Sequence, residues 1–397
     1  MQQKEEGETL TTFIQSFEFN TVPSIQMEWS GGRRLGEILG ARFAARKALV
    51  VTDAGLVKAG VVAPVAGSLE AAGFKVTLFD AILADPPESI LAQCVDEAKT
   101  AGVDIVIGLG GGSSLDVAKL VAILVRSPQA LASMAGIGNV KGGRLPLVLI
   151  PTTAGTGSEV TNISIITTGE HTKTGVVAPQ LFCDFVLLDA ELTVGLPPIH
   201  TAATGIDAMV HAIEAFTGRH KKNPISDGLA RDALRLLGGN LVAACKDGKD
   251  RTAREGMLIG ATLAGQAFAN SPVGAVHALA YPLGGHYHVA HGLSNALMLG
   301  PVLRFNATAA ASLYADLADV LLGPGEGDTV ARSAAFVAGM ERLMDESGAP
   351  RRLREVGVKE ETLPMLASEA MKQTRLLVNN PVEVAEADAL ALYREAF

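Results

Sequence analysis

Side chains that could hold a metal ion gather in two segments of this sequence. Asp207 and His211 are four positions apart, so a helix would place both on one face. Half of the chain's eight histidines fall between residues 277 and 291; these are His277, His286, His288 and His291. Three neutral imidazoles and one carboxylate suit Fe(II) or Zn(II), and the bound ion would keep positive charge to polarise a substrate oxygen. The pattern favours a catalytic metal centre over a structural one.

A glycine-rich turn at residues 108–115 is typical of an anion-binding site. It follows the apolar, β-branched run 105–107 and precedes a segment of helical character. Glycines let the backbone approach a phosphate, Ser113 or Ser114 can cap the helix, and the helix N-terminus offers unpaired N–H groups. However, Ser113 stands where the fingerprint Gly-x-Gly-x-x-Gly has its third glycine. The turn alone leaves a pyrophosphate site and a ligand-free βα turn equally open.

A second loop, residues 151–161, combines glycines with hydroxyl side chains after another apolar run. Ligands of open α/β sheets bind beyond the carboxyl ends of the strands, so two such loops would line one crevice. Asp53 also follows an apolar run, where it could accept hydrogen bonds from a ribose and repel a 2′-phosphate. These features favour a nucleotide site with NAD over NADP. The alternatives are a helix-capping Asp53 and plain turn residues at Thr152 and Thr153.

The hydrophobic pattern predicts the elements that position these loops. Short β-branched runs alternate with amphipathic stretches at 48–52, 75–79, 104–107, 145–150 and 185–188. Continuous apolar strands joined by helices indicate a parallel sheet covered on both faces. After Pro197 and Pro198, alanine- and leucine-rich segments of helical periodicity dominate. We therefore predict an α/β domain over residues 1–196 and a helical domain over residues 197–397.

Composition excludes several classes of protein. A chain of 397 residues has ample surface to bury in two domains, and its net charge of −9 gives no general attraction to nucleic acid or anionic lipid. Cys94, Cys183 and Cys245 lack paired spacing, which indicates neither a disulfide framework nor a thiolate metal site and fits a reducing cytoplasm. The amino terminus is polar, and no apolar run reaches membrane-spanning length. A cytoplasmic protein without nucleic-acid or membrane partners is predicted.

With these motifs the sequence resembles the iron-containing (group III) alcohol dehydrogenase family, nearly end to end. The resemblance rests on the turn Gly110–Lys119, the loop Pro151–Thr161, the segment Gly205–Phe216 and the run His277–Asn306. It implies the architecture shared with dehydroquinate synthase, in which a Rossmann-like α/β domain precedes an all-helical domain and the site lies in the cleft between them. It also implies a homodimer or larger homo-oligomer.

The resemblance implies roles for single residues. The metal ligands would be Asp207, His211, His277 and His291. The pyrophosphate would be cradled by Gly111, Gly112, Ser113 and Asp116. Contacts to the adenosine, ribose and nicotinamide parts are implied for Thr152, Thr153, Thr156, Ser158, Lys173 and Leu192.

Further positions near the expected site leave alternatives open. Many family members carry a histidine four residues after the first late metal histidine, whereas this chain has Tyr281. Its phenol could relay a proton or donate a hydrogen bond, although a pKa near 10 makes it a weak base, or it could only shape the pocket. Phe268 matches a position that walls the substrate pocket in relatives, with core packing as the alternative. His286 and His288 could reach the substrate or face solvent.

The predicted function is reversible hydride transfer between NAD and a small primary alcohol, diol or hydroxy acid. A divalent metal, Fe(II) in preference to Zn(II), would activate the substrate oxygen. The alternatives are a lyase of the dehydroquinate-synthase type and an alcohol–oxoacid transhydrogenase that retains its NAD. A scaffold protein without chemistry is disfavoured by the complete set of four ligands.

Overall fold

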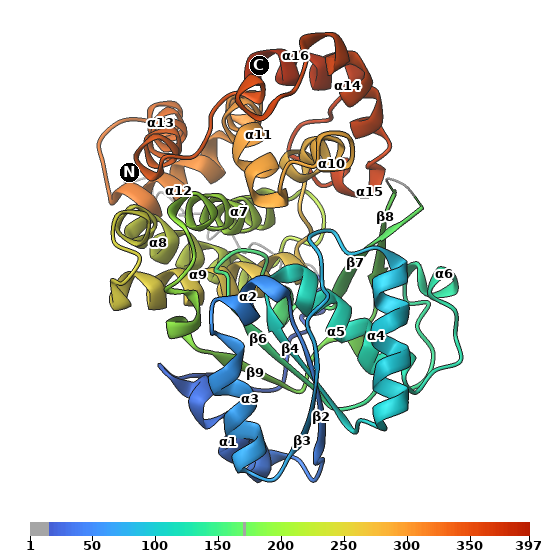
Figure 1. Ribbon diagram of the computed structural model, residues 1–397. Helices are drawn as coiled ribbons and strands as arrows, with labels where there is room; N and C mark the ends of the chain where they lie inside the picture. The colour runs from blue at the N-terminus through green and yellow to red at the C-terminus, as the bar shows by residue number, and fades with distance from the viewer. Residues whose placement is uncertain (1–15, 170–171) are drawn as a thin grey trace, which may run out of the picture.

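Six parallel strands form the main sheet of this protein. The computed structural model describes residues 16–169 and 172–397 (Figure 1). The strand order is β1-β9-β6-β4-β2-β3. The strands are β1 (Ile25–Met27), β2 (Lys47–Val51), β3 (Lys75–Phe79), β4 (Ile105–Gly110), β6 (Leu147–Pro151) and β9 (Phe185–Leu188). Every predicted strand lies in this sheet, which confirms the predicted parallel α/β fold.

Helices cover both faces of the sheet, so its strands carry apolar residues without alternation. Val50 and Ile107 pack into a core with α1 (Leu35–Arg42) and α3 (Val62–Ala71). Their neighbours Leu49 and Val106 point to the opposite face, which is covered by other helices. These are α4 (Glu88–Ala101) and α5 (Gly112–Leu124). The short α2 (Ala54–Lys58) follows β2 at the end of the sheet.

A second, smaller sheet has the order β5-β8-β7, which the sequence pattern did not predict. Its strands are β5 (Gly136–Ile137), β7 (Ile163–Thr168) and β8 (Thr172–Val177), and the short α6 (Leu131–Met134) precedes β5. β7 and β8 pair antiparallel, with Ile165 opposite Gly175. Figure 1 shows β8 reaching up to the helical half of the molecule.

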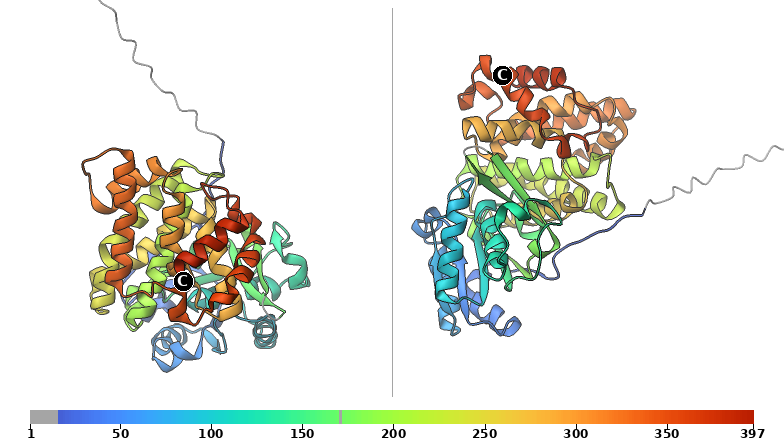
Figure 2. Two further views of the ribbon diagram at one scale, coloured as in Figure 1. Left: turned by 90° about the horizontal axis from the view of Figure 1, so that it is seen from above. Right: turned by 90° about the vertical axis from the view of Figure 1, so that its right-hand side faces the viewer.

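From Pro198 onward the described chain is helical. The helices are α7 (Pro198–Thr217), α8 (Pro224–Lys246), α9 (Arg251–Asn270), α10 (Ala275–Tyr287), α11 (His291–Asn306), α12 (Ala311–Leu322), α13 (Thr329–Ser347), α14 (Leu363–Met371), α15 (Thr374–Leu377) and α16 (Glu386–Ala396). Short 3-10 turns are η1 (Gly31–Arg34), η2 (Ser158–Val160), η3 (Pro179–Leu181), η4 (Ala190–Thr193), η5 (Leu353–Val356) and η6 (Glu360–Thr362). Figure 2 shows these helices stacked on one end of the sheet half.

Helix α7 is the central element of this helical half. Pro198 occupies its first position, where the missing N–H costs no hydrogen bond. Almost every residue from Thr201 to Thr217 is buried, which is the pattern of a helix packed on all sides. The hydrophobic core runs without a break from the sheet into these helices. The division into two domains near Pro197 stays a prediction. Among the described helices, none is long and apolar enough to cross a membrane.

Candidate metal centre and cofactor cleft

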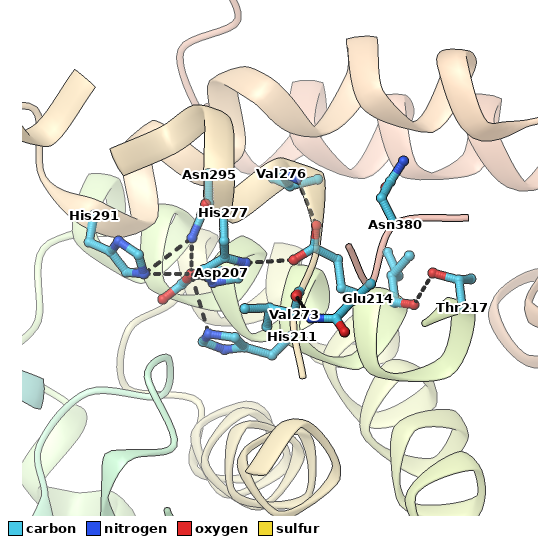
Figure 3. Close-up of polar contacts among 12 residues, drawn as sticks. Asp207, His211, Glu214, Thr217, Val273, Val276, His277, His291, Asn295 and Asn380 are labelled. Atoms are coloured by element: carbon cyan, nitrogen blue, oxygen red, sulfur yellow. Dashed lines mark hydrogen bonds and ion pairs between the residues drawn. The ribbon is translucent and has the colours of Figure 1, made fainter. Parts of the chain in front are cut away.

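Four side chains from three helices converge on one point (Figure 3). Asp207 and His211 come from α7, His277 from the first turn of α10, and His291 is the first residue of α11. The Nε2 atoms of His211, His277 and His291 lie 3.9, 3.8 and 3.7 Å from Asp207 Oδ1. These separations are too long for hydrogen bonds but close to the roughly 3.4 Å edge of a tetrahedron of ligands about 2.1 Å from one ion. The four residues named from the sequence are therefore brought together in space.

The electrostatics of this cluster fit a divalent ion. Burial lowers the pKa of His211 to about 3 and also lowers the pKa of His291. Burial opposes ionisation of Asp207 as well, but the neighbouring imidazoles outweigh it, and the pKa of Asp207 is lowered. Neutral His211 and His291 and an ionised Asp207 are the protonation states that metal ligands need.

A second carboxylate fixes the orientation of His277. Glu214 Oε2 lies 2.7 Å from His277 Nδ1, and Glu214 Oε1 accepts the Val276 N–H at 2.7 Å. With the Nδ1 proton directed at Glu214, the Nε2 lone pair of His277 faces the cluster. Within the described part of the chain that buried Nε2 has no hydrogen-bond partner, an arrangement that is costly unless an ion binds there. The residues present therefore fit a metal ion.

Asn295 supports the carboxylate ligand in a similar way. Its Nδ2 donates to Asp207 Oδ1 at 2.5 Å and lies 3.3 Å from His291 Nε2. The sequence analysis missed both Asn295 and Glu214. Helical spacing could have found them, because Glu214 is seven residues after Asp207 and Asn295 is four residues after His291.

Two aromatic side chains border the cluster. The Phe268 ring stacks on His211, with 4.3 Å between ring centroids and 19° between planes. The Tyr281 ring is 6.0 Å from the His291 ring. Burial raises the pKa of Tyr281, although the charge of Arg375 opposes this effect. Tyr281 is therefore a neutral phenol that can donate a hydrogen bond but does not serve as a base near neutral pH.

The other two candidate histidines lie outside the cluster of four. His286 and His288 are both exposed, and His288 ends α10 in the left-handed region with a φ of 54°. Their predicted contact with substrate stays a prediction.

The two predicted cofactor loops meet at the carboxyl ends of β4 and β6. A Cβ on Gly112 would lie 2.9 Å from Thr156 Cγ2, and one on Gly111 would lie 3.6 Å from Thr153. Glycine at 112 is required for this close approach. Ser113 lies inside the first turn of α5, whose N-terminus has no side-chain cap. The prediction that a serine caps this helix is wrong, and the uncapped N–H groups suit a phosphate.

Asp53 caps α2, as one of the two interpretations predicted. Its Oδ1 accepts the Leu56 N–H at 3.0 Å. β2, which Asp53 follows, lies between β3 and β4, where the strand order reverses direction. Ligands of such sheets bind at this switch point, so the cap and a contact to ribose are compatible.

Asp116 and Ser158 form a buried polar link between the two loops. Asp116 Oδ1 accepts the Ser158 hydroxyl at 2.6 Å, and Oδ2 accepts the Ile165 N–H at 2.8 Å. The fully buried Lys119 donates to Ser158 Oγ at 2.8 Å and to the Ile163 carbonyl at 2.7 Å. Burial raises the pKa of Asp116 and lowers that of Lys119. These contacts show a joining role, whereas the predicted contacts of Asp116 and Ser158 to NAD stay predictions.

The remaining predicted cofactor residues lie around the same sheet end. Thr152 is buried directly after β6. Lys173 on β8 pairs with Asp85, at 2.5 Å from Nζ to Oδ1. Leu192 in η4 lies beyond β9, where its Cδ1 would be 3.7 Å from a Cβ on Gly32. Their cofactor contacts stay predictions.

The fold and the centre together are those of a metal-dependent dehydrogenase: a parallel sheet with a glycine-rich turn at a helix N-terminus, and an Asp-His₃ cluster in the adjoining helices. The model of iron-containing alcohol dehydrogenases matches residues 25–190, and that of the C-terminal region of the Fe-containing alcohol dehydrogenase family matches residues 201–397. The chain belongs to this family.

Similar proteins cover almost the whole chain. Long-chain-alcohol dehydrogenase 1 of Geobacillus thermodenitrificans is 41% identical over 90% of this chain and 91% of its own length. Sulfoacetaldehyde reductase of Bilophila wadsworthia is 39% identical over 88% of this chain and 92% of its own. A crystal structure of 1,3-propanediol oxidoreductase superposes with a TM-score of 0.91 at 34% identity, over 96% of this chain and 100% of that one. The protein is thus an oxidoreductase that interconverts small alcohols and aldehydes, and its family implies NAD and a divalent metal.

Proposed function

We propose that this enzyme interconverts a small primary alcohol and its aldehyde with NAD, at an Fe(II) ion held by Asp207, His211, His277 and His291. The observation that carries the proposal is the convergence of these four ligand atoms within 4.8 Å. When bound, the ion supplies a Lewis acid for the substrate oxygen, and NAD accepts or donates the hydride.

The chain's own residues hold the reacting groups in place. Glu214 fixes the tautomer of His277 and Asn295 holds Asp207 Oδ1, so the ligand geometry is set before any substrate arrives. Phe268 covers His211 and keeps water from that side of the centre. Tyr281 supplies a neutral hydroxyl near His291, suited to donating a hydrogen bond to an oxygen in the pocket.

The same geometry favours NAD over NADP. Asp53 places a carboxylate at the switch point of the sheet, where it can accept a hydrogen bond from a ribose hydroxyl and repel a 2′-phosphate. Fe(II) and Zn(II) both suit three imidazoles and one carboxylate, and we propose Fe(II) on the family match. Relatives carry names that range from long-chain-alcohol dehydrogenase to sulfoacetaldehyde reductase, so a panel of aldehydes of both kinds should be tested.

We further propose a cytoplasmic homodimer or larger homo-oligomer. The family match favours a dehydrogenase over the lyase alternative. A transhydrogenase that retains its NAD is distinguished by exchange of bound cofactor with free labelled NAD.

The test is anaerobic NADH oxidation by purified protein, loaded with Fe(II) or Zn(II), against small aldehydes, ketones and oxoacids. Asp207→Ala should lose metal and turnover together, because Asp207 Oδ1 is the atom around which the three histidines gather. Asp232→Ala is the control, since Asp232 is an exposed aspartate on α8. Full turnover by rigorously metal-free protein would refute the proposal.

A further inference from the structure

A cationic side chain lies on a short helix beside the helix that carries Tyr281. Arg375 lies on the short helix α15, which contacts α10, the helix that carries His277 and Tyr281. Its Nη2 atom lies 3.6 Å from the position that a Cβ on Gly175 of β8 would take. Figure 1 shows α15 directly beside the upper end of β8. The guanidinium therefore lies where the helical half meets the small sheet.

The guanidinium of Arg375 pairs with no acidic side chain among residues 16–169 and 172–397. Its backbone carbonyl accepts from Asn379 Nδ2 at 3.1 Å. The neighbouring cation Lys173, by contrast, is neutralised by Asp85 at 2.5 Å. A side chain at position 175 would lie against the Arg375 guanidinium, so Gly175 leaves the space on the β8 side of the guanidinium open.

The charge of the guanidinium acts on a residue beside the metal centre. Its charge is the largest influence opposing the effect of burial on the pKa of Tyr281. The Tyr281 ring in turn is 6.0 Å from the ring of the ligand His291. Arg375 is therefore a cation within electrostatic reach of the phenol that borders the metal centre.

We propose that Arg375 binds an anionic group at the far end of the substrate, so that the preferred substrates are short aldehydes and alcohols with a terminal sulfonate, carboxylate or phosphonate. This inference rests on the proposed function, because the aldehyde oxygen must lie at the metal centre for its other end to reach Arg375. A guanidinium presents a planar fork of donors that matches such oxyanions in two-point contact. Arg375 is then a residue that determines specificity, and it takes no part in the hydride transfer itself.

The experiment compares two aldehydes of nearly equal shape and different charge. Sulfoacetaldehyde carries a sulfonate, and 3,3-dimethylbutanal carries a neutral tert-butyl group in its place. Metal-loaded wild type, Arg375→Gln and Arg375→Lys are assayed for kcat/KM with each aldehyde at saturating NADH. Lys372→Gln is the matched control, because it removes one positive charge from the adjacent segment, where the ammonium is paired with Glu369.

The expected result is a loss specific to the charged substrate. Arg375→Gln should lower kcat/KM for sulfoacetaldehyde roughly 10- to 100-fold and change that for 3,3-dimethylbutanal less than about threefold. Arg375→Lys should retain part of the preference, and Lys372→Gln should leave it unchanged. The KM for NADH should stay the same in all variants.

A binding measurement gives a readout independent of turnover. Isethionate, the alcohol form of sulfoacetaldehyde, should bind the wild-type NAD complex and bind the Arg375→Gln complex roughly 10- to 100-fold more weakly.

Two outcomes separate this inference from the proposed function. If the wild type reduces 3,3-dimethylbutanal but Arg375→Gln impairs both aldehydes equally, or raises the KM for NADH instead, Arg375 serves folding or cofactor binding and the inference is wrong. If the metal-loaded wild type reduces neither these aldehydes nor any of the wider panel, the proposed function itself fails.

Discussion

Glu214→Gln is predicted to weaken binding of a divalent metal without unfolding the protein. Glu214 is not one of the four expected metal ligands. Its two oxygens accept hydrogen bonds from His277 Nδ1 and from the Val276 N–H, each at 2.7 Å. The side chain therefore acts as a positioning residue for the ligand His277. Glutamine has nearly the same shape but only one acceptor oxygen. Its amide NH₂ group must therefore face either the Val276 N–H or His277 Nδ1, which both donate to Glu214.

The magnitude follows from these two contacts. Replacing the carboxylate removes a hydrogen bond to a charged group, which contributes about 1.5–3 kcal/mol in a buried setting. Since about 1.4 kcal/mol corresponds to tenfold, the metal affinity should fall by roughly 10- to 100-fold, in the range found for outer contacts of ligating histidines. His277 would also lose the preference that keeps its Nε2 lone pair toward the centre.

The assay is anaerobic competition between the protein and a fluorescent chelator for Fe(II) or Zn(II), with thermal unfolding of the metal-free protein measured in parallel. Thr217→Val is the matched control, because Thr217 is buried one turn further along α7 and donates only to the Ile213 carbonyl. Wild-type metal affinity in Glu214→Gln would refute the reasoning. So would an equal loss in Thr217→Val, since that would indicate a general disturbance of α7.

Three further substitutions test other parts of the site. Tyr281→Phe should lower kcat/KM but leave the shape of its pH profile between about pH 6 and 9 unchanged. The reason is that burial raises the pKa of the phenol above its ordinary value near 10, so the phenol does not titrate in that range. A rise or fall of kcat/KM with pH that is present in the wild type and absent in the variant would contradict this. Asp53→Asn should keep the cap on Leu56 N–H and the melting temperature, while the preference for NADH over NADPH, measured as a ratio of kcat/KM, falls about tenfold. Lys119→Met should lower the free energy of unfolding in guanidinium chloride by about 3 kcal/mol, because it removes a buried cation and leaves the half-buried Asp116 carboxylate without its partner. An unchanged denaturation midpoint would refute a stabilising role.

The main sheet was predictable because its strands are buried on both faces. Runs such as Leu147–Pro151 are apolar at every position, and that signal depends on the local sequence alone. The hairpin of β7 and β8 escaped prediction for the opposite reason. Thr167, Thr168 and Lys173 give it a polar, half-exposed pattern that resembles a loop, and β8 also pairs with β5, a segment distant in sequence.

The metal ligands were predictable because their residue types are rare and their spacing is informative. The residues that support the ligands were not found, since a glutamate or an asparagine in a helix is ordinarily a solvated side chain. Glu214 becomes distinctive only when α10 brings His277 and Val276 against α7, which is a tertiary contact. Ser113 shows the converse error, since residue type favoured a cap while the backbone begins the helix one residue before it.

The exposure of the four ligands indicates from which side a substrate approaches. The side chains of Asp207, His277 and His211 are 1%, 3% and 5% exposed, whereas that of His291 is 40% exposed. Phe268 closes the centre on the side of His211. The open direction is therefore the side of His291, where Tyr281 stands. A substrate that enters there with its oxygen toward the buried ligands keeps its other end on the side of Tyr281, the residue on which the charge of Arg375 acts. On our proposal for Arg375, the end of the substrate remote from the chemistry is therefore where charge decides which aldehyde binds.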